Sequence, residues 1–339
     1  MRRTRQPLIA PGLFVVLGLC LAGTGLGAAS PPTDFRTIEL TYRTEIGPIE
    51  AGRGPVHVFL PLPVQSEQQR IESSDVQATI PGRVEIEETY GNRYWHGYLE
   101  ESDGAPIEVT ARLVVKRRVF QRDVPANGGG REFTDAERAE LGRFLQANER
   151  VVVGHAVLDP ILAEVREAAG TTERAAVARA IYDWVVDNVE YKKVGTGWGN
   201  GDTFWACSER YGNCTDFHAL FISLARTEGI PARFEIGFPV PEDRPEGTIG
   251  GYHCWVEFLL PETGWFPVDA SEAFKHPDKR DLFYGTQPAD RIHFTTGRDL
   301  RLGADHRGRP LNYFIYPYVE LEGGAYEGRV ERSFSYREP

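Results

Sequence analysis

Three residues, Cys214, His253 and Asp269, have the types and the order that acyl transfer through a thiol requires. Cys214 stands in the segment Gly-Asn-Cys-Thr-Asp, His253 opens an aromatic run typical of a strand, and Asp269 closes the next such run. A thiol becomes a nucleophile when a nearby imidazole takes its proton, and a carboxylate can hold that imidazole in one orientation. The sequence therefore predicts attack on an acyl carbon, and it says much less about the substrate.

The pattern around Cys214 predicts that this residue begins a helix. Apolar residues follow it at helical spacing, and a glycine and a proline end the run (Phe217, Leu220, Phe221, Leu224; Gly229, Pro231). An ordinary thiol, with a pKa of about 8.5, is mostly protonated near neutrality, whereas the free N–H groups and the dipole of a helix N-terminus favour the thiolate. A cysteine can also be a small apolar core residue. The His and Asp partners favour the catalytic interpretation.

The loop between the strands of His253 and Asp269 decides whether the two side chains can meet. Side chains alternate between the faces of a strand, so the two share a face only if this loop has an odd number of residues. A three-residue loop at 261–263 would pair Leu260 with Gly264 and make Asp269 a diagonal neighbour of His253. A loop of even length would place the two on opposite faces.

Two other interpretations of the same residues stay open. His218 follows Cys214 by four residues, hence on the same helix face, and could be the base or a wall of the site. A metal cluster could also be drawn from the nearby thiols and imidazoles (Cys207, Cys214, His218, His253, Cys254). No C-x-x-C or H-E-x-x-H spacing supports such a cluster. The sequence therefore predicts neither a metal nor another cofactor.

The first 29 residues are predicted to be an export signal. Three arginines precede an apolar stretch at 8–22, and Gly27-Ala28-Ala29 offers small residues for cleavage. Lipid attachment at Cys20 and an uncleaved anchor are the alternatives. We expect a periplasmic or secreted protein without a stable membrane span in its mature part. Because the signal carries three arginines and no acid, cleavage changes the net charge from −11 to −14, which argues against a nucleic-acid partner.

The cysteine count gives modest support to a reactive thiol. Of four cysteines, one lies in the predicted signal, which leaves an odd number in the mature chain. A free thiol is a liability in an oxidising compartment unless it is used. Cys207 and Cys254 could form a disulfide, although the sequence does not fix their separation.

The order of elements predicts an α+β fold. Short alternating strands with Gly and Pro between them indicate an N-terminal β-sandwich at 33–123, followed by a glycine-containing linker at 124–133. Residues 134–339 are expected to form the catalytic domain, with helices packed on an antiparallel sheet and further strands near the C-terminus. Helices are expected at 134–147, 159–169 and 172–189. The aromatic loop at 191–211 either lines a cleft or folds over its own rings.

The motifs of the predicted catalytic domain resemble the transglutaminase-like superfamily. Its members carry G-x-C-x-D, G-I-P-A-R, H-x-W-V-E and G-W-x-x-x-D motifs in this order, and the chain matches them between residues 172 and 270. The resemblance implies a papain-like core with Cys214 as nucleophile, His253 as base and Asp269 as orienting carboxylate. It also implies that the preceding sandwich corresponds to the β-domain found in bacterial members. Trp205 and Trp198 are candidates for the second oxyanion donor, beside the Cys214 backbone N–H.

The resemblance leaves the reaction open, because members cross-link glutamine to lysine, hydrolyse amides or peptides, or have lost catalysis. No acidic loop in the chain has a calcium-ligand pattern. We expect an exported cysteine protease or amidase, with a protein-glutamine acyltransferase as the related option and an inactive binding module as the alternative. The partner would be a protein or peptide substrate, held between aromatic walls that include Trp255 and Trp265. No pattern in the sequence addresses the oligomeric state.

Overall fold

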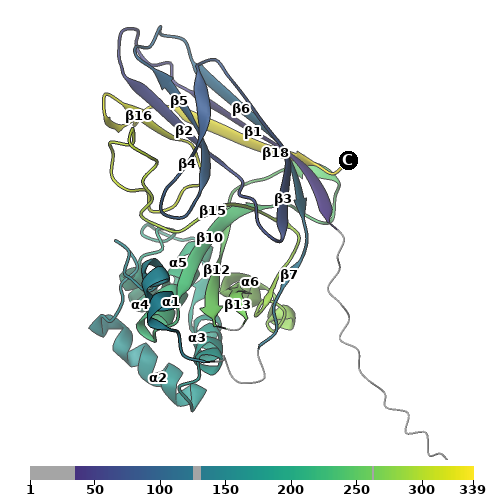
Figure 1. Cartoon of the computed structure of the whole chain (residues 1–339), viewed down its shortest axis with the longest axis vertical. Coiled ribbons are helices and arrows are strands. Elements are labelled where there is room, and N and C mark those ends of the chain that lie inside the picture. Colours follow the sequence, from purple (N-terminus) through teal and green to yellow (C-terminus); the bar gives the residue numbers. More distant parts are fainter. Residues whose placement is uncertain (1–34, 125–130, 262) are drawn as a thin grey trace, which may run out of the picture. The chain divides into compact units, whose positions relative to one another are not determined.

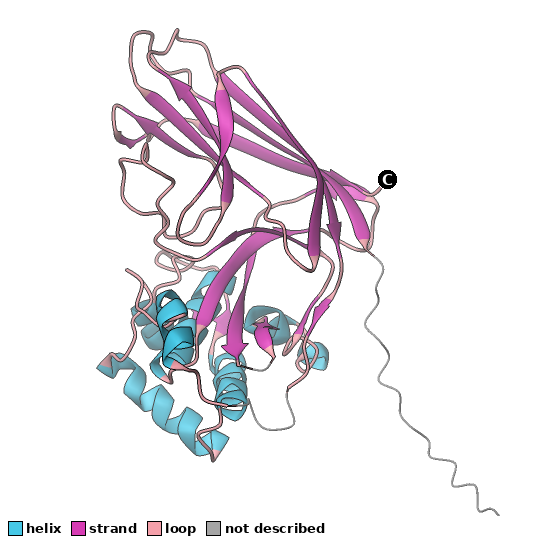
Figure 2. Cartoon of the chain, in the orientation of Figure 1, coloured by secondary structure: helices cyan, strands magenta, loops and turns pink. Residues whose placement is uncertain are grey.

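The computed structural model describes residues 35–124, 131–261 and 263–339. The predicted export signal and most of the glycine linker lie outside these ranges. Figures 1 and 2 show a region of strands and a region of helices around a smaller sheet, so the predicted α+β class is confirmed. Among the helices of the described ranges, none is long and apolar enough to cross a membrane.

Two antiparallel five-stranded sheets form the β-rich region (Figure 1). The first has the order β11 (Glu246–Thr248), β18 (Val330–Arg337), β1 (Arg36–Ile46), β6 (Ile107–Arg117) and β3 (Gln69–Ala78). The second has the order β17 (Gly324–Ala325), β16 (Tyr318–Leu321), β2 (Val56–Leu62), β5 (Arg93–Leu99) and β4 (Gly82–Ile86). Alternate apolar residues of β1 and β6 are buried with those of β2 in one core, as a sandwich requires.

The C-terminal strands differ from the expectation that placed them with the catalytic domain. β18 pairs with β1, and β16 pairs with β2, so both complete the sheets that the N-terminal strands begin. An alternating pattern shows that a strand has one buried face, but it does not say which partner lies beside its edges. The sandwich is therefore built from both ends of the described chain, while the domain boundaries themselves stay a prediction.

A four-stranded antiparallel sheet and six α-helices make up the other region. The sheet has the order β13 (Gly264–Val268), β12 (His253–Leu260), β10 (Ala232–Pro239) and β15 (Arg291–Thr296). The helices are α1 (Asp135–Glu140), α2 (Asp159–Ala169), α3 (Arg174–Asn188), α4 (Thr203–Glu209), α5 (Cys214–Thr227) and α6 (Ala270–Lys275). Short ribbons pair β7 (Phe120–Gln121) with β14 (Thr286–Gln287), and β8 (Glu190–Tyr191) in parallel with β9 (Tyr211–Gly212).

The predicted helices agree with the structure in three places out of four. α2 ends at Gly170, whose positive φ closes the helix, and α3 and α5 lie where the apolar spacing places them. The first helix is shorter than expected, because α1 is followed by a 3₁₀ turn at Gly142–Phe144. Helix α4 was missed inside the segment interpreted as a loop; Asp202, which caps it, was the available signal.

Two amide side chains of the sandwich region bind strand β15, which lies at the edge of the four-stranded sheet. The Gln69 side chain donates to the His293 carbonyl at 2.7 Å and accepts from the His293 N–H at 2.8 Å. Asn92 makes the same pair of bonds with Thr296, both at 2.8 Å. These bonds satisfy backbone groups that an edge strand would leave unpaired, and they couple the two regions close to the sheet that carries His253.

Candidate active site

The N-terminus of α5 places the Cys214 thiol. Asn213 caps the helix, because its side-chain oxygen accepts from the Thr215 N–H at 2.9 Å. Asp216 completes a capping box by accepting from the Asn213 N–H at 2.9 Å. Cys214 is thus the first helical residue, where backbone N–H groups lack intrahelical partners, and it is only 2% exposed.

Asp216 also holds the loop in front of the nucleophile. Its two carboxylate oxygens accept from the N–H groups of Gly199 at 2.6 Å and Gly201 at 3.0 Å. The buried guanidinium of Arg298 donates to the Gly201 carbonyl from the opposite side at 2.8 Å. A side chain at Gly212 would collide with the Asp216 carboxylate, which explains the glycine of the G-x-C-x-D motif. Sequence reasoning gave Asp216 no role, although its place three residues after a helix cap was a signal.

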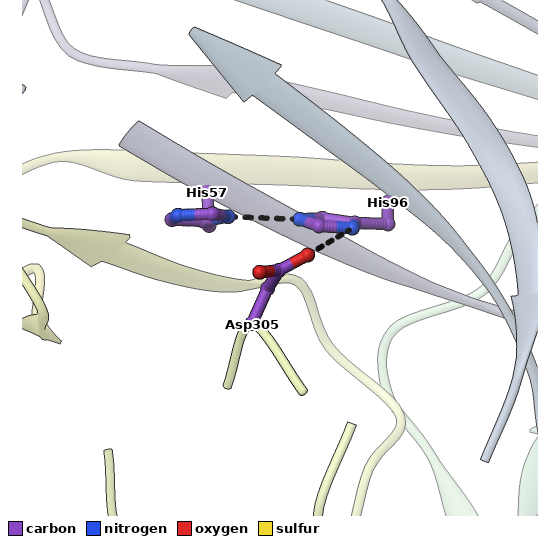
Figure 3. Close-up of side chains that lie close together, drawn as sticks. All are labelled: His57, His96 and Asp305. Carbon is purple, nitrogen blue, oxygen red and sulfur yellow. Dashed lines mark hydrogen bonds and ion pairs between the residues drawn. The ribbon is translucent and has the colours of Figure 1, made fainter. Parts of the chain in front are cut away.

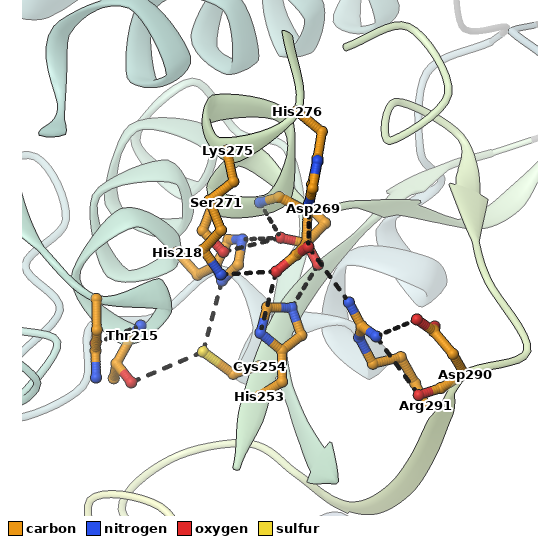
Figure 4. A network of polar contacts seen from close by, with 12 residues as sticks. Thr215, His218, His253, Cys254, Asp269, Ser271, Lys275, His276, Asp290 and Arg291 are labelled. Carbon is orange, nitrogen blue, oxygen red and sulfur yellow. Dashed lines mark hydrogen bonds and ion pairs between the residues drawn. The ribbon is translucent and has the colours of Figure 1, made fainter. Parts of the chain in front are cut away.

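His253 and Asp269 form a buried pair at the end of the hairpin between β12 and β13. Leu260 pairs with Gly264, so of the two alternatives left open by the sequence the loop of odd length holds, and His253 and Asp269 share a face. Asp269 Oδ2 lies 2.6 Å from His253 Nε2, while Asp269 Oδ1 caps α6 by accepting from the Glu272 N–H and the Ser271 hydroxyl, both at 3.0 Å (Figure 4). Because Nε2 is bound to the carboxylate, Nδ1 is the ring nitrogen left for the thiol.

Tyr252, the residue before His253, joins β12 to α5. Its hydroxyl lies 2.9 Å from the Thr215 hydroxyl and accepts from the Asn213 side-chain amide at 3.1 Å. These bonds fix the start of the His253 strand against the start of the Cys214 helix. The sequence shows that Tyr252 is next to the predicted base, but it does not show that the Tyr252 hydroxyl binds Asn213 and Thr215.

The three pKa values of the site favour a thiolate and an imidazolium. Burial raises the pKa of the Cys214 thiol, but hydrogen bonds with Cys254 and His253 and the positive charge of His253 outweigh it, so the pKa falls well below its ordinary value. Burial lowers the pKa of His253, yet the Asp269 charge and hydrogen bond raise it to about 9. Burial raises the pKa of Asp269, but the charge and hydrogen bond of His253 and the charge of His218 outweigh it, so the pKa of Asp269 falls below its ordinary value. The carboxylate stays ionised beside the imidazolium.

Pulse alkylation across pH is expected to separate Cys214 from Cys207, a second thiol on α4. Iodoacetamide reacts with thiolates, so Cys214 should be labelled at pH 6 to 7. Burial raises the pKa of Cys207 to about 11, so this internal control should stay unlabelled until strongly alkaline pH. Mass spectrometry of the digested protein measures both rates. Labelling of Cys214 that rises only above pH 8 would contradict a thiolate–imidazolium pair.

Cys254 and His218 are two further buried residues that contact the site of Cys214, His253 and Asp269. The Cys254 sulfur is 3.7 Å from the Thr215 hydroxyl and 3.6 Å from His218 Nδ1, and His218 Nε2 is 3.5 Å from Asp269 Oδ1. His218 is completely buried, and burial lowers its pKa. His218 therefore faces the Asp269 oxygen that His253 does not bind, and its Nδ1 faces Cys254, a position that favours the wall of the site over the base. Cys207, Cys214 and Cys254 are all free thiols, so the suggested Cys207–Cys254 disulfide is absent from the described chain.

The tryptophans differ from their expected roles. The indole N–H of Trp205 donates to the Tyr211 carbonyl at 2.8 Å, and that of Trp198 donates to the Gly195 carbonyl at 3.1 Å. Neither indole is free to act as the second oxyanion donor in this arrangement, and Trp205 packs on its own loop at Gly197. The aromatic loop thus follows the second of its two interpretations, in which it folds over its own rings.

Two further tryptophans give little support to aromatic cleft walls. Trp255 is 1% exposed and packs edge-on against His293, inside the protein. Trp265 packs against Phe144 and lies 4.0 Å from the Arg233 guanidinium. Trp255 is therefore too deeply buried to form a wall for a peptide substrate, and the Trp265 ring is in contact with Phe144 and Arg233.

The fold and the site together define a class. A cysteine at the start of a helix that packs on an antiparallel sheet, with a His–Asp pair on that sheet, is the papain-like arrangement. The profile of the transglutaminase-like superfamily matches residues 162–270. This segment of the chain belongs to that superfamily, and the resemblance drawn from the four motifs is confirmed.

Relatives of the chain extend the comparison. An uncharacterised protein of Haemophilus influenzae is 24% identical over 95% of this chain and 96% of its own length. The uncharacterised protein YebA of Bacillus subtilis is 31% identical over 77 residues, which are 20% of this chain and 10% of YebA. The structure of a candidate cysteine protease from Cytophaga hutchinsonii is similar over 89% of this chain and 91% of its own, with a TM-score of 0.56 and 18% identity. That likeness extends to the fold of sandwich and core together.

Proposed function

We propose that the protein is an exported thiol enzyme that hydrolyses amide or peptide bonds, with Cys214 as nucleophile, His253 as base and acid, and Asp269 as the carboxylate that orients His253. The observation that carries the proposal is the 2.6 Å bond between His253 Nε2 and Asp269 Oδ2, beside a Cys214 thiol whose pKa is lowered. A buried ion pair of this kind is costly to a fold, and it supplies the nucleophile and the proton that acyl transfer needs.

The chemistry follows in two steps. The Cys214 sulfur attacks the carbonyl carbon. The oxyanion that forms accepts a hydrogen bond from the backbone N–H of Cys214, in the first turn of α5. Protonated His253 gives its proton to the leaving amine, and a thioester remains on Cys214. His253, now neutral, takes a proton from water, the hydroxide attacks the thioester, and the acid leaves with the thiolate restored. Asp269 keeps the ring in one tautomer throughout.

Hydrolysis is proposed over transfer to an amine because water needs no dedicated site. A transamidase must hold a second substrate and keep water away from the thioester. The superfamily includes both reactions, so an experiment has to separate them. The proposed export rests on the arginine-led apolar N-terminus of the chain.

Incubation of the mature protein with casein and a tagged primary amine tests the reaction. We expect new amino termini and smaller fragments, without stable attachment of the tag, because water resolves the thioester. Gel analysis follows cleavage, and tag fluorescence follows transfer. If the tag is attached to intact casein, the reaction is transamidation and the proposed hydrolysis is wrong. Neither product, with Cys214 shown to be a reactive thiolate, would favour the alternative of a binding module that keeps the fold.

A further inference from the structure

Three potential metal ligands converge on the sandwich, apart from the thiol site. His57 on β2, His96 on β5 and Asp305 each offer one ligand atom, and these atoms all lie within 4.8 Å of one another (Figure 3). His57 pairs with Tyr98 and His96 with Phe59, so the two histidines are diagonal neighbours on one face of adjacent strands. Asp305 comes from the segment between β15 and β16, far away in the sequence.

The segment that carries Asp305 covers the outer face of the second sheet. Phe59 and Tyr94 of the sheet form a small apolar core with the segment's Leu300, Leu302 and Phe314, separate from the core between the sheets. This cluster fixes the segment on the strands. Asp305 thereby lies beside two histidines that belong to a different part of the chain.

The two ring nitrogens lie close enough to share an ion after a small movement. His57 Nδ1 and His96 Nε2 are 2.9 Å apart, a hydrogen-bond distance, whereas two nitrogen ligands of tetrahedral zinc at about 2.0–2.1 Å are separated by roughly 3.3 Å. Phe59 stacks on the His96 ring at 4.7 Å and 5°, which restricts its rotation. Glu85 lies 3.3 Å from His96 Nδ1, and a carboxylate on the far ring nitrogen directs the other nitrogen towards a metal.

The third ligand and the open positions lie on a cavity. The cavity has a volume of about 530 Å³ and is lined by the two histidines, Asp305 and Arg83, among others. Asp305 Oδ2 lies 4.0 Å from His96 Nδ1, the nitrogen that also faces Glu85, and because the Asp305 side chain is 44% exposed, its carboxylate is free to turn towards an ion held by the two rings. Arg83 is paired with Glu85 at 2.5 Å, which leaves the Asp305 charge to balance a cation.

We propose that His57, His96 and Asp305 bind a divalent transition-metal ion, with zinc as the ion of choice, and that its remaining positions face the cavity. Two imidazole nitrogens and one carboxylate are the donor set of zinc and related ions, whereas calcium and magnesium require oxygen. The bond between the rings needs one N–H proton, which moves to the far nitrogen of that ring when the ion binds. The ion would fasten the Asp305 segment to the sheet and raise the free energy of unfolding.

The test is a zinc titration of the mature chain after removal of metal with a chelator. Calorimetry is expected to show zinc bound at this site, and thermal unfolding a rise in Tm with zinc but not with magnesium. Asp305→Asn and His57→Gln should each remove one bound zinc, lower the affinity at least about 100-fold and abolish the Tm rise. If His57→Gln does not fold because His57 is buried, Asp305→Asn still tests the proposal, since Asp305 is more exposed and lies at the cavity. Asp75→Asn, an exposed aspartate on β3, is the control and should bind like the unchanged protein.

Zinc could also bind the Cys214 thiolate, so the titration is repeated in Cys214→Ala and with cobalt. Cobalt at the proposed site should show weak visible bands of nitrogen and oxygen ligation, and these should persist in Cys214→Ala and vanish in Asp305→Asn. The proposal is overturned if the unchanged protein binds no zinc. It is overturned equally if zinc is lost in Cys214→Ala while both sandwich variants retain it. In those cases the two histidines share only a hydrogen bond.

Discussion

Replacement of Cys214 by alanine is expected to leave the protein folded and to lower kcat for amide hydrolysis by at least about 10⁴-fold. The thiol offers a covalent route that divides one difficult hydrolysis into two easier steps. Neither Cys254 nor Cys207 can replace it, because burial raises both of their pKa values and keeps them protonated. Cys254 also contacts His218 and Thr215, and it is itself a hydrogen-bond partner of the Cys214 thiol.

The measurement is cleavage of casein by the purified variant, with circular dichroism and Tm as tests of the fold. Removal of one buried sulfur should cost only about 1–2 kcal/mol of unfolding free energy. Cys207→Ala is the matched control, since it removes a half-buried thiol from α4 and should keep full turnover. Residual activity near that of the unchanged protein would move the nucleophile to another residue.

Local patterns were enough to predict the elements that carry the site. The apolar spacing after Cys214 predicted the ends of helix α5 to within two residues, because helical periodicity depends only on residues that are near one another in the sequence. The alternation along the hairpin gave its two strands and reduced the question of the shared face to the parity of one loop, which the structure shows to be odd. The four motifs identified the superfamily for the same reason, because each is a short stretch with one local geometry.

Contacts between distant segments could not be predicted in this way. The pairing of β18 with β1 joins residues about 300 positions apart, and no local pattern names such a partner. His57 and His96 are separated by 39 residues and gave no motif, although their rings meet on adjacent strands.

His253→Ala is expected to be as damaging as Cys214→Ala, because the thiol and the imidazole act as one unit. Without the ring, the thiol loses a hydrogen bond and a positive charge that lower its pKa, so burial raises that pKa again. Alkylation of Cys214 should then need alkaline pH. His276→Ala, which removes a half-exposed histidine at the end of α6, is the control and should leave labelling and turnover unchanged.

Asp269→Asn is expected to lower kcat by roughly 10³- to 10⁴-fold. In the structure one Asp269 oxygen accepts from the Glu272 N–H and the Ser271 hydroxyl, so the amide oxygen would take that place. The NH₂ group would then face His253 Nε2 and force the ring proton onto Nδ1, where it opposes proton transfer from the thiol. The pKa of His253, about 9 with the carboxylate present, should fall, and the alkaline limit of activity should fall with it. A pH profile of kcat tests this, and an unchanged alkaline limit in Asp269→Asn would show that Asp269 only caps helix α6.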